Sequence, residues 1–208
     1  MNSIITIGRE FGSGGRELGR RLAEKLGIEY YDNEIIEEIA KHTSLSEEYI
    51  QSVTERRPHR LFPIHIGRSF VYLKDHAFED SNTVFQTQCS IIRDLAKKSD
   101  CVIIGRCAEY VLKDYAPYRI FVYADMDSKI KRCKEKGAEH EHFSDKEMER
   151  HILEVDKRRS EYYAFYTAMT WGEKAHYDLC VNTSKINIKE LSIKLADFIR
   201  KQDAKIKI

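Results

Sequence analysis

The residues with the clearest chemical potential form a glycine-rich loop near the N-terminus. The segment Ile5-Thr-Ile-Gly-Arg-Glu-Phe-Gly-Ser-Gly-Gly-Arg-Glu-Leu18 places glycines at positions 8, 12, 14 and 15 between a predicted strand and a predicted helix. Glycines allow successive backbone N–H groups to turn toward one point, and the helix N-terminus adds partial positive charge. Such a loop suits the phosphates of a nucleoside triphosphate. The residues predicted to bind them are Gly12, Ser13, Gly14, Gly15 and Arg16.

The loop departs from the standard phosphate-binding pattern G-x-x-x-x-G-K-[ST]. If Gly14 is the last loop glycine, Gly15 stands where the pattern has lysine, and Arg9 stands where it has the first glycine. Arg16 then stands where the pattern has serine or threonine. Arg16 can still bring a cation to the phosphates and Ser13 a hydroxyl, but magnesium lacks its usual protein hydroxyl. A glycine-rich turn that binds no ligand is the alternative interpretation.

Two further charged side chains come directly after predicted strands. Arg106 follows the apolar run 101–104, and Asp32 follows a short strand. Ligands of parallel α/β sheets lie at the carboxyl ends of the strands, so both side chains are candidates for substrate binding. Asp32 has an alternative role as the N-cap of the next helix.

The hydrophobic pattern predicts the elements that position these residues. Short apolar runs rich in β-branched residues alternate with segments of helical period. The predicted strands cover residues 3–7, 28–31, 101–104, 118–123 and 177–181. The predicted helices cover residues 16–26, 34–41, 82–97 and 127–136, a long stretch from a capping box at Ser144 toward Trp171, and a last helix around 188–199. Strands separated by helices need crossover connections, so we predict an α/β domain with a central parallel sheet covered on both faces.

Length, charge and cysteine content exclude several classes of protein. The 208 residues are enough for one α/β domain and few for two. A formal net charge of +1 argues against a nucleic-acid polymer as the partner. No apolar run reaches the roughly 18 residues that would indicate a membrane span. The five cysteines lack C-x-x-C spacing and the N-terminus lacks a signal-peptide pattern, so we expect reduced thiols and a cytoplasmic location.

Four blocks of sequence together resemble the cytidylate kinase-like family, a divergent branch of the P-loop nucleoside monophosphate kinases. The blocks are Gly8-Arg-Glu-Phe-Gly-Ser-Gly-Gly-Arg-Glu17, Tyr31-Asp-Asn33, Val102-Ile-Ile-Gly-Arg-Cys107 and Asp156-Lys-Arg-Arg-Ser-Glu-Tyr-Tyr163. The resemblance runs with gaps over nearly the whole chain. It implies one P-loop NTPase-type three-layer domain with a helical substrate-binding insertion and a helical lid. Its core would be 1–44, 81–136 and 172–208, its insertion about 45–80 and its lid about 137–171.

The resemblance also assigns roles to individual residues. Asp32 and Arg106 would face the acceptor, and Arg158 or Arg159 would be the lid arginine that meets the transferring phosphoryl group. The family's aspartate after Gly-Arg is replaced by Cys107, which bears on recognition of a cytosine nucleotide. The loop lysine has no match, and Arg16 is our substitute for it rather than the family's residue. Arg158 and Arg159 could instead belong to a solvated helix face.

The resulting hypothesis is an enzyme, a nucleoside monophosphate kinase-like phosphotransferase. It would use ATP and Mg²⁺ and transfer a phosphoryl group to a nucleoside monophosphate, with CMP or dCMP as the expected acceptor. Arg16, Arg158 and Arg159 are the candidate catalytic residues. Two alternatives stay open: a nucleotide-binding regulatory protein without turnover, and a kinase of another small metabolite.

Two other groups of residues are given structural rather than functional interpretations. His140, His142 and His151 lack zinc-site spacing and a cysteine partner, so we predict a polar lid turn and no metal-ligating residues. The aromatic residues between 162 and 171 are predicted to pack in the core rather than to stack on bases. The irregular stretch 56–67 is either part of a substrate-binding insertion or a surface loop.

Overall fold

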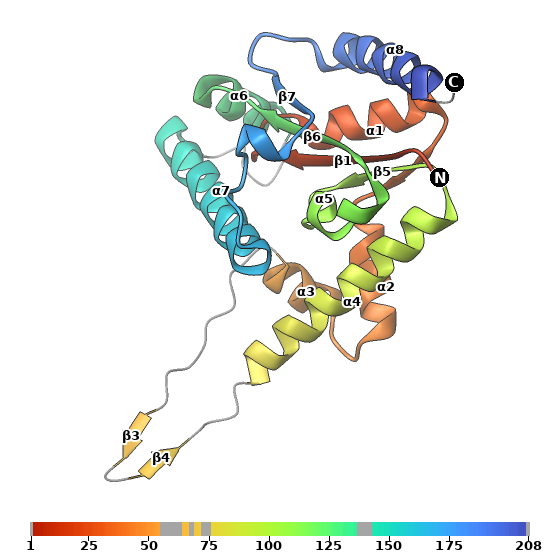
Figure 1. Cartoon of the computed structure of the whole chain (residues 1–208). Helices are drawn as coiled ribbons and strands as arrows, with labels where there is room; N and C mark the ends of the chain where they lie inside the picture. Colours follow the sequence, from red (N-terminus) through yellow and green to blue (C-terminus); the bar gives the residue numbers. More distant parts are fainter. Residues whose placement is uncertain (1, 55–63, 67–68, 72–75, 137–142, 207–208) are drawn as a thin grey trace.

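The computed structural model describes residues 2–54, 64–66, 69–71, 76–136 and 143–206, in which helices alternate with strands (Figure 1). All the strands and helices predicted from the sequence are present, with some shifts at their ends. The elements are β1 (Ile4–Arg9), α1 (Gly15–Leu26), β2 (Glu29–Tyr31), α2 (Glu34–His42), α3 (Glu47–Val53), β3 (Ile64–Ile66), β4 (Ser69–Val71), α4 (His76–Lys98), β5 (Cys101–Ile104), α5 (Ala108–Val111), η1 (Lys113–Tyr115), β6 (Tyr118–Tyr123), α6 (Met126–Lys136), α7 (Asp145–Thr167), η3 (Lys174–His176), β7 (Leu179–Asn182) and α8 (Ile188–Ile206).

Five strands form one parallel sheet in the order β2-β5-β1-β6-β7, which confirms the predicted α/β fold with a central parallel sheet. The central strand β1 pairs with β5 through Ile5 opposite Val102, and with β6 through Ile7 opposite Ile120. Because all five strands are parallel, their carboxyl ends share one edge. The glycine-rich loop leaves β1 at the middle of that edge.

Successive side chains of β1 and β5 point to opposite faces of the sheet, so both faces carry apolar side chains. Helices cover both faces. Ile4, Cys101 and Ile103 pack with the apolar residues of α2, α3 and α4. Ile5 and Ile7, on the other face, pack with the apolar stripes of α1 and α8. Figure 1 shows this three-layer arrangement, with α1 and α8 on one side of the sheet and α2 and α4 on the other.

Helices α6 and α7 lie beside the edge of the sheet at which β1 ends (Figure 1). Ser144 caps α7 as predicted, because its hydroxyl accepts from the Glu147 N–H while the Glu147 carboxylate accepts from the Ser144 N–H. Met148 and Ile152 of α7 pack against Cys133 of α6 in a small cluster with Phe11. The two helices are therefore fixed against the glycine-rich loop.

The region predicted as a helical insertion contains a helix and also an element that the sequence did not indicate. Helix α3 lies within it, and β3 and β4 form an antiparallel pair with Ile64 opposite Val71. Most of the irregular stretch 56–67, and the lid histidines at 140 and 142, lie outside the described residues.

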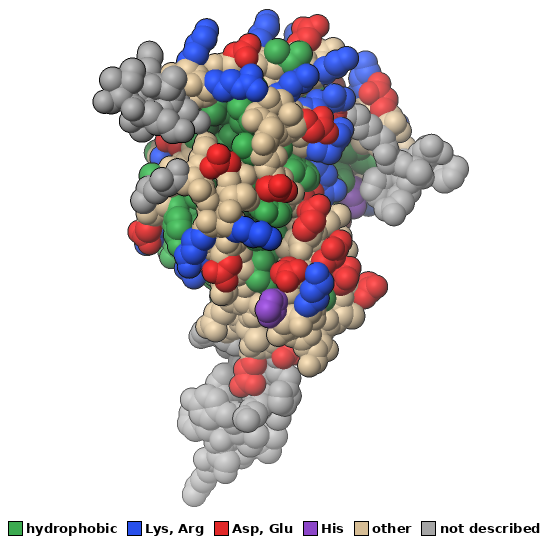
Figure 2. Space-filling model, turned by 90° about the vertical axis from the view of Figure 1, so that its right-hand side faces the viewer, with side chains coloured by type: hydrophobic (Ala, Val, Ile, Leu, Met, Phe, Trp, Pro, Cys, Tyr) green, Lys and Arg blue, Asp and Glu red, His purple; other side chains and the backbone are tan. Residues whose placement is uncertain are grey.

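The face in Figure 2 carries both signs of charge. Lys and Arg side chains are most numerous at the height of α8 and α1, and Asp and Glu side chains predominate lower down. Neither positive nor negative charge alone therefore dominates this face. Within the described ranges, no helix is both long and apolar enough to cross a membrane.

Candidate functional site

The glycine-rich loop has the backbone geometry of an anion-binding nest. Gly12 and Gly14 have φ of 71° and 81°, in the left-handed region that favours glycine. A Cβ atom at Gly12 would lie 2.9 Å from Cys133 Sγ, so the loop packs too closely on α6 for a side chain. Over the described part of the chain, no acceptor pairs with the N–H groups of Gly12, Gly14, Gly15 and Arg16.

The carbonyl oxygens of the same loop accept hydrogen bonds from side chains outside the loop. Thr183, which follows β7, donates its hydroxyl to the Ser13 carbonyl oxygen at 2.6 Å. Arg132 of α6 donates to the carbonyl oxygens of Gly12 and Ser13 at 3.5 and 3.4 Å. Because these contacts fix the carbonyl groups, the free N–H groups are preorganised without a ligand.

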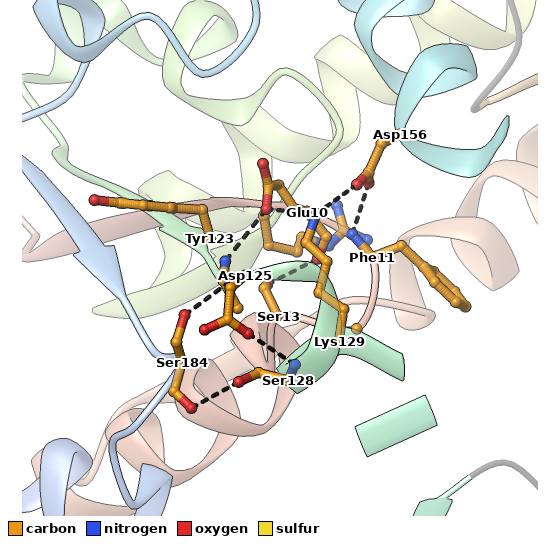
Figure 3. A network of polar contacts seen from close by, with 12 residues as sticks. Glu10, Phe11, Ser13, Tyr123, Asp125, Ser128, Lys129, Asp156 and Ser184 are labelled. Atoms are coloured by element: carbon orange, nitrogen blue, oxygen red, sulfur yellow. Dashed lines mark hydrogen bonds and ion pairs between the residues drawn. The ribbon is translucent and has the colours of Figure 1, made fainter. Parts of the chain in front are cut away.

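A buried ion-pair network joins the loop to α6 and α7 (Figure 3). Lys129 of α6 has a side chain only 7% exposed, and its Nζ lies 2.6 Å from Glu10 Oε2 and 3.1 Å from Asp156 Oδ2. Asp156 of α7 also accepts from the Phe11 N–H at 2.7 Å, and Glu10 accepts from the Ala124 N–H at 3.2 Å. One lysine thus satisfies carboxylates from two elements and holds α7 against the loop.

Burial dominates the electrostatics of this network. It raises the pKa of Asp156 above its ordinary value, although the Phe11 N–H and the charge of Lys129 act in the opposite direction. These two partners therefore stabilise the ionised form of the Asp156 carboxyl group against the effect of burial.

Two cavities adjoin the loop and the end of β1. The larger, about 760 Å³, is lined by Phe11, Gly12, Gly14, Arg16, Glu17, Arg20, Arg21, Tyr30, Asp32, Asn33, Glu34, Arg132 and Cys133. It lies within the size range of small-molecule sites, roughly 300–1,000 Å³. The smaller, about 40 Å³, is lined by Gly8, Arg9, Thr54, Gly105, Arg106, Cys107, Glu109, Arg159, Tyr162, Tyr163 and Trp171.

In the larger cavity Arg16 and Asp32 form an ion pair, with Arg16 Nε 2.5 Å from Asp32 Oδ2. The Arg16 side chain is 62% exposed, whereas that of Asp32 is 5% exposed. Asp32 Oδ1 is buried and finds no hydrogen-bond partner among the described residues. Asp32 is not the N-cap of α2, since the cap position belongs to Asn33. The capping alternative for Asp32 was wrong because its carboxylate turns to Arg16.

In the smaller cavity Arg106 is buried at 8% exposure. Its Nη1 donates to the Thr54 hydroxyl at 2.5 Å, and its Nε meets no acceptor in the described portion of the chain. Arg106 has φ of 59° and Cys107 of 54°, an uncommon left-handed conformation for residues with side chains. Each such residue costs about 1–3 kcal/mol and persists only where its surroundings hold it.

The two candidate lid arginines differ in position. Arg159 lines the smaller cavity, donates to the Arg9 carbonyl oxygen at 3.4 Å, and has its guanidinium carbon 5.7 Å from the centre of the Phe11 ring. Arg158 is half-buried and lines neither cavity. The structure therefore brings Arg159 to the loop and to Arg106, but not Arg158. It also separates Asp32 from Arg106, which the sequence had placed together.

Glu109 of α5 is a buried carboxyl at the base of the smaller cavity. Burial raises its pKa from the ordinary 4.5, although its own backbone N–H, the nearby hydroxyls of Tyr163 and Tyr177 and the charge of Arg9 act in the opposite direction. Beside it, burial raises the pKa of the Cys107 thiol well above its ordinary value. Cys107 is thus a neutral side chain where the resemblance led us to look for an aspartate.

The sequence reasoning missed Arg9, Lys129 and Glu109. Lys129 left a detectable signal, because it lies on the same helical stripe as the apolar Met126 and Cys133, three residues after one and four before the other. A lysine on an apolar stripe is seldom buried unless it is paired. Arg9 stands at the first-glycine position of the loop pattern, and that exchange was visible in the sequence.

The match to a family model covers most of the chain. The model described as the cytidylate kinase-like family matches residues 4–185. Two relatives named "Cytidylate kinase" have similar sequences. The one from Pyrococcus horikoshii is 26% identical over 88% of this chain and 80% of its own, and the one from Methanopyrus kandleri is 25% identical over 89% and 86%.

Solved structures share the fold over nearly the whole chain. An uncharacterized protein from Eubacterium ventriosum has a TM-score of 0.69 at 27% identity, covering 97% of this chain and 99% of its own. A shikimate kinase from Acinetobacter baumannii, solved with shikimate, has a TM-score of 0.53 at 16% identity, covering 97% and 94%. At that identity the shikimate kinase shows the fold alone.

Proposed function

The chain belongs to the cytidylate kinase-like family, and from this premise we propose that it transfers the γ-phosphoryl group of ATP to a nucleoside monophosphate, with CMP or dCMP as the expected acceptor. Family and fold together support a nucleotide kinase. The five free cysteines fit a reducing compartment, and we place the reaction in the cytoplasm.

One observation carries this proposal: the buried Arg106, whose Nε has no partner among the described residues, in a cavity that adjoins the loop. A buried guanidinium with an unused donor is unfavourable unless an anion completes its hydrogen bonds. An acceptor phosphate is such an anion, since arginine binds phosphate oxygens through two parallel N–H donors.

The donor triphosphate would lie on the free N–H groups of the loop. The N-terminus of α1 adds positive charge there, because its first N–H groups have no intrahelical partners. Arg16, the second residue of the same helix, remains a candidate for a donor phosphate, although Asp32 now holds its guanidinium. The larger cavity has room for the nucleoside part of a nucleotide, and the unpaired Asp32 Oδ1 can accept from a hydroxyl or amino group of that ligand.

Among the described residues, the side chains near the loop do not provide a ligand set for magnesium. The Ser13 hydroxyl donates to the Glu10 carbonyl oxygen at 2.8 Å, and the Glu10, Glu17 and Asp32 carboxylates pair with Lys129, Arg21 and Arg16. Mg²⁺ would therefore arrive bound to the triphosphate oxygens, where it neutralises charge.

The chain's own residues would position the reactants and stabilise charge, because phosphoryl transfer needs little covalent help from the protein. Arg106 would hold the acceptor phosphate so that one of its oxygens faces the γ-phosphorus. Arg159, from the opposite side, would approach the equatorial oxygens on which charge accumulates. Arg158 stays a candidate only if α7 turns as it closes.

The smaller cavity is too small for a nucleotide as it stands. Its walls include residues from elements far apart in the sequence: Thr54 follows α3, Arg106 follows β5, and Tyr162 belongs to α7. Acceptor binding therefore requires α7 or the region of α3 to move away, and reclosure would exclude water from the transfer.

The proposal is tested by incubating the purified full-length protein with ATP, Mg²⁺ and each ribo- and deoxynucleoside monophosphate. We expect diphosphate from CMP or dCMP, detected by chromatography. Diphosphate from none of them, with ATP binding intact by calorimetry, would leave a regulatory nucleotide-binding protein. Consumption of ATP that depends on an acceptor other than a monophosphate would indicate a kinase of another small metabolite.

A further inference from the structure

Arg9 and Gly15 occupy reciprocal positions in the loop. The standard pattern has glycine at the position of Arg9 and lysine at that of Gly15, so this chain has a cationic residue and a glycine with their places exchanged. The exchange is physically coupled. A Cβ atom at Gly15 would lie 2.5 Å from Arg9 Cβ and 3.1 Å from Arg9 Cγ, so no side chain fits at position 15 while Arg9 is present.

The Arg9 side chain is also fitted closely at its far end. A Cβ atom at Gly105 would overlap Arg9 Nη1 and lie 2.9 Å from Cζ. Gly105 has φ of 64°, so both its conformation and its missing side chain suit the guanidinium that crosses it. The side chain thus runs from the first residue of α1 to the strand end that carries Arg106, and it is buried at 8% exposure.

We propose that Arg9 supplies the cation for the transferring phosphoryl group that lysine supplies in the standard loop, delivering it from the end of β1 instead of the start of α1. This inference rests on the proposed kinase function. Arg9 lines the smaller cavity together with Arg106 and Arg159, so three guanidinium groups come from the ends of β1 and β5 and from α7. A fork of donors there can bind phosphate oxygens bidentately, which a lysine cannot do.

Arg9 also faces protein groups, and a purely structural role is the competing explanation. It lies within electrostatic reach of the buried Glu109 and of Tyr30. If Arg9 served only as a counter-ion for Glu109, its removal would lower stability and leave the kinetics of the folded protein unchanged. The two roles are therefore separable by kinetics on variants that remain folded.

The first variant is Arg9→Met, which keeps an unbranched stem between Gly15 and Gly105 and removes the charge. We expect kcat for diphosphate formation to fall roughly 100-fold or more with a smaller change in the KM for ATP, as for loss of a contact made mainly in the transition state. Arg93→Met is the matched control, since Arg93 is exposed on α4 and lines neither cavity. Full kcat in folded Arg9→Met would overturn the proposal.

The sharper experiment restores the standard pattern. Gly15→Lys alone should be inactive or misfolded because its Cβ meets Arg9, and Arg9→Gly alone should lack the cation. The double variant Arg9→Gly/Gly15→Lys removes the collision with Arg9, leaves a 3.3 Å approach to Val122 Cβ, and returns a cation. Its kcat should therefore exceed that of Arg9→Gly by about tenfold or more. A double variant that melts like the wild type but is no more active than Arg9→Gly would contradict the exchange.

A binding measurement keeps this inference distinct from the proposed function. If the wild type transfers phosphate to no monophosphate, the proposed acceptor fails, and Arg9 is then tested by calorimetry with MgATP and with inorganic tripolyphosphate. We expect Arg9→Met to weaken both by about tenfold or more and Arg93→Met to weaken neither. Equal affinities in wild type and Arg9→Met, or no binding of either probe by the wild type, would overturn the proposal.

Discussion

Each of the two cavities beside the glycine-rich loop contains an arginine, and the two arginines differ in exposure and in pairing. Arg16 in the larger cavity is 62% exposed and already paired with Asp32. Arg106 in the smaller cavity is buried and keeps a donor with no partner among the described residues. An exposed ion pair contributes about 0–1 kcal/mol, whereas a buried donor left unpaired costs about 1–3 kcal/mol. The smaller cavity is therefore the one whose polar groups are incomplete without an anion.

The largest effect should come from Arg106→Ala, because it removes the donor on which this contrast depends. We expect kcat/KM for the acceptor to fall roughly 100- to 1,000-fold. Steady-state kinetics at saturating ATP measures it, with Arg158→Ala as the control that leaves both cavities intact. A loss in Arg158→Ala that equals the loss in Arg106→Ala would mean that burial does not identify the functional arginine.

Lys129→Met tests the network that holds α7 against the loop, beside both cavities. The variant leaves the Glu10 and Asp156 carboxylates without their shared cation, and breaking a buried pair from one side costs about 3–5 kcal/mol. Urea unfolding should show a free energy of unfolding lowered by about 3 kcal/mol.

Lys131→Met is the matched control on the same helix. The Lys131 side chain is 75% exposed and its Nζ lies 3.9 Å from Glu135, so its removal should change stability by under about 0.5 kcal/mol. A similar decrease in the free energy of unfolding in the two variants would show that the buried ion pairs of Lys129 stabilise the fold no more than an exposed pair does.

Glu109 provides a pH test at the base of the smaller cavity. Because burial raises its pKa above 4.5, the folded state binds this proton more tightly than the unfolded state does. Its contribution to stability is complete below about pH 4.5 and is lost as the pH rises through the folded pKa. As the pH rises above about 4.5, the free energy of unfolding should therefore fall more steeply for the wild type than for Glu109→Gln. Parallel curves from denaturant titrations would place the Glu109 carboxyl in a water-like environment.

The smallest effect is expected for Arg16→Ala, in the larger cavity. We expect a change in stability of under about 1 kcal/mol, because the pair with Asp32 is exposed on the Arg16 side. We also expect the KM for ATP to rise by less than about tenfold, as for a partly solvated phosphate contact. If Arg16→Ala lowered kcat/KM more than Arg106→Ala does, the larger cavity rather than the smaller one would contain the more important arginine.

The sequence was sufficient to predict the sheet and its helices because their patterns are local. The apolar run 101–104 and the capping box at Ser144 each correspond to an element that begins where its pattern does. The position of the loop at the carboxyl edge then follows from the parallel topology. The β3–β4 pair was not predicted, because its strands have only three residues each, too few to show a period.

The grouping of site residues was beyond sequence reasoning for physical reasons. Asp32 and Arg106 both follow strands of the same edge, yet only packing decides which of the two cavities each one lines. The exchange of Arg9 and Gly15 could be seen as a departure from a pattern, but the collision that couples them required coordinates. The choice between Arg158 and Arg159 likewise depended on the rotation of α7.

The central claim is that the γ-phosphoryl group of ATP moves to the phosphate of an acceptor held at Arg106. Its most direct test is to follow [γ-³²P]ATP with CMP and Mg²⁺ by thin-layer chromatography, in the wild type and in Arg106→Ala. The account predicts label in CDP from the wild type and roughly 100-fold slower labelling in the variant. Label that stays in ATP or appears only as inorganic phosphate, with CMP unchanged, would contradict it.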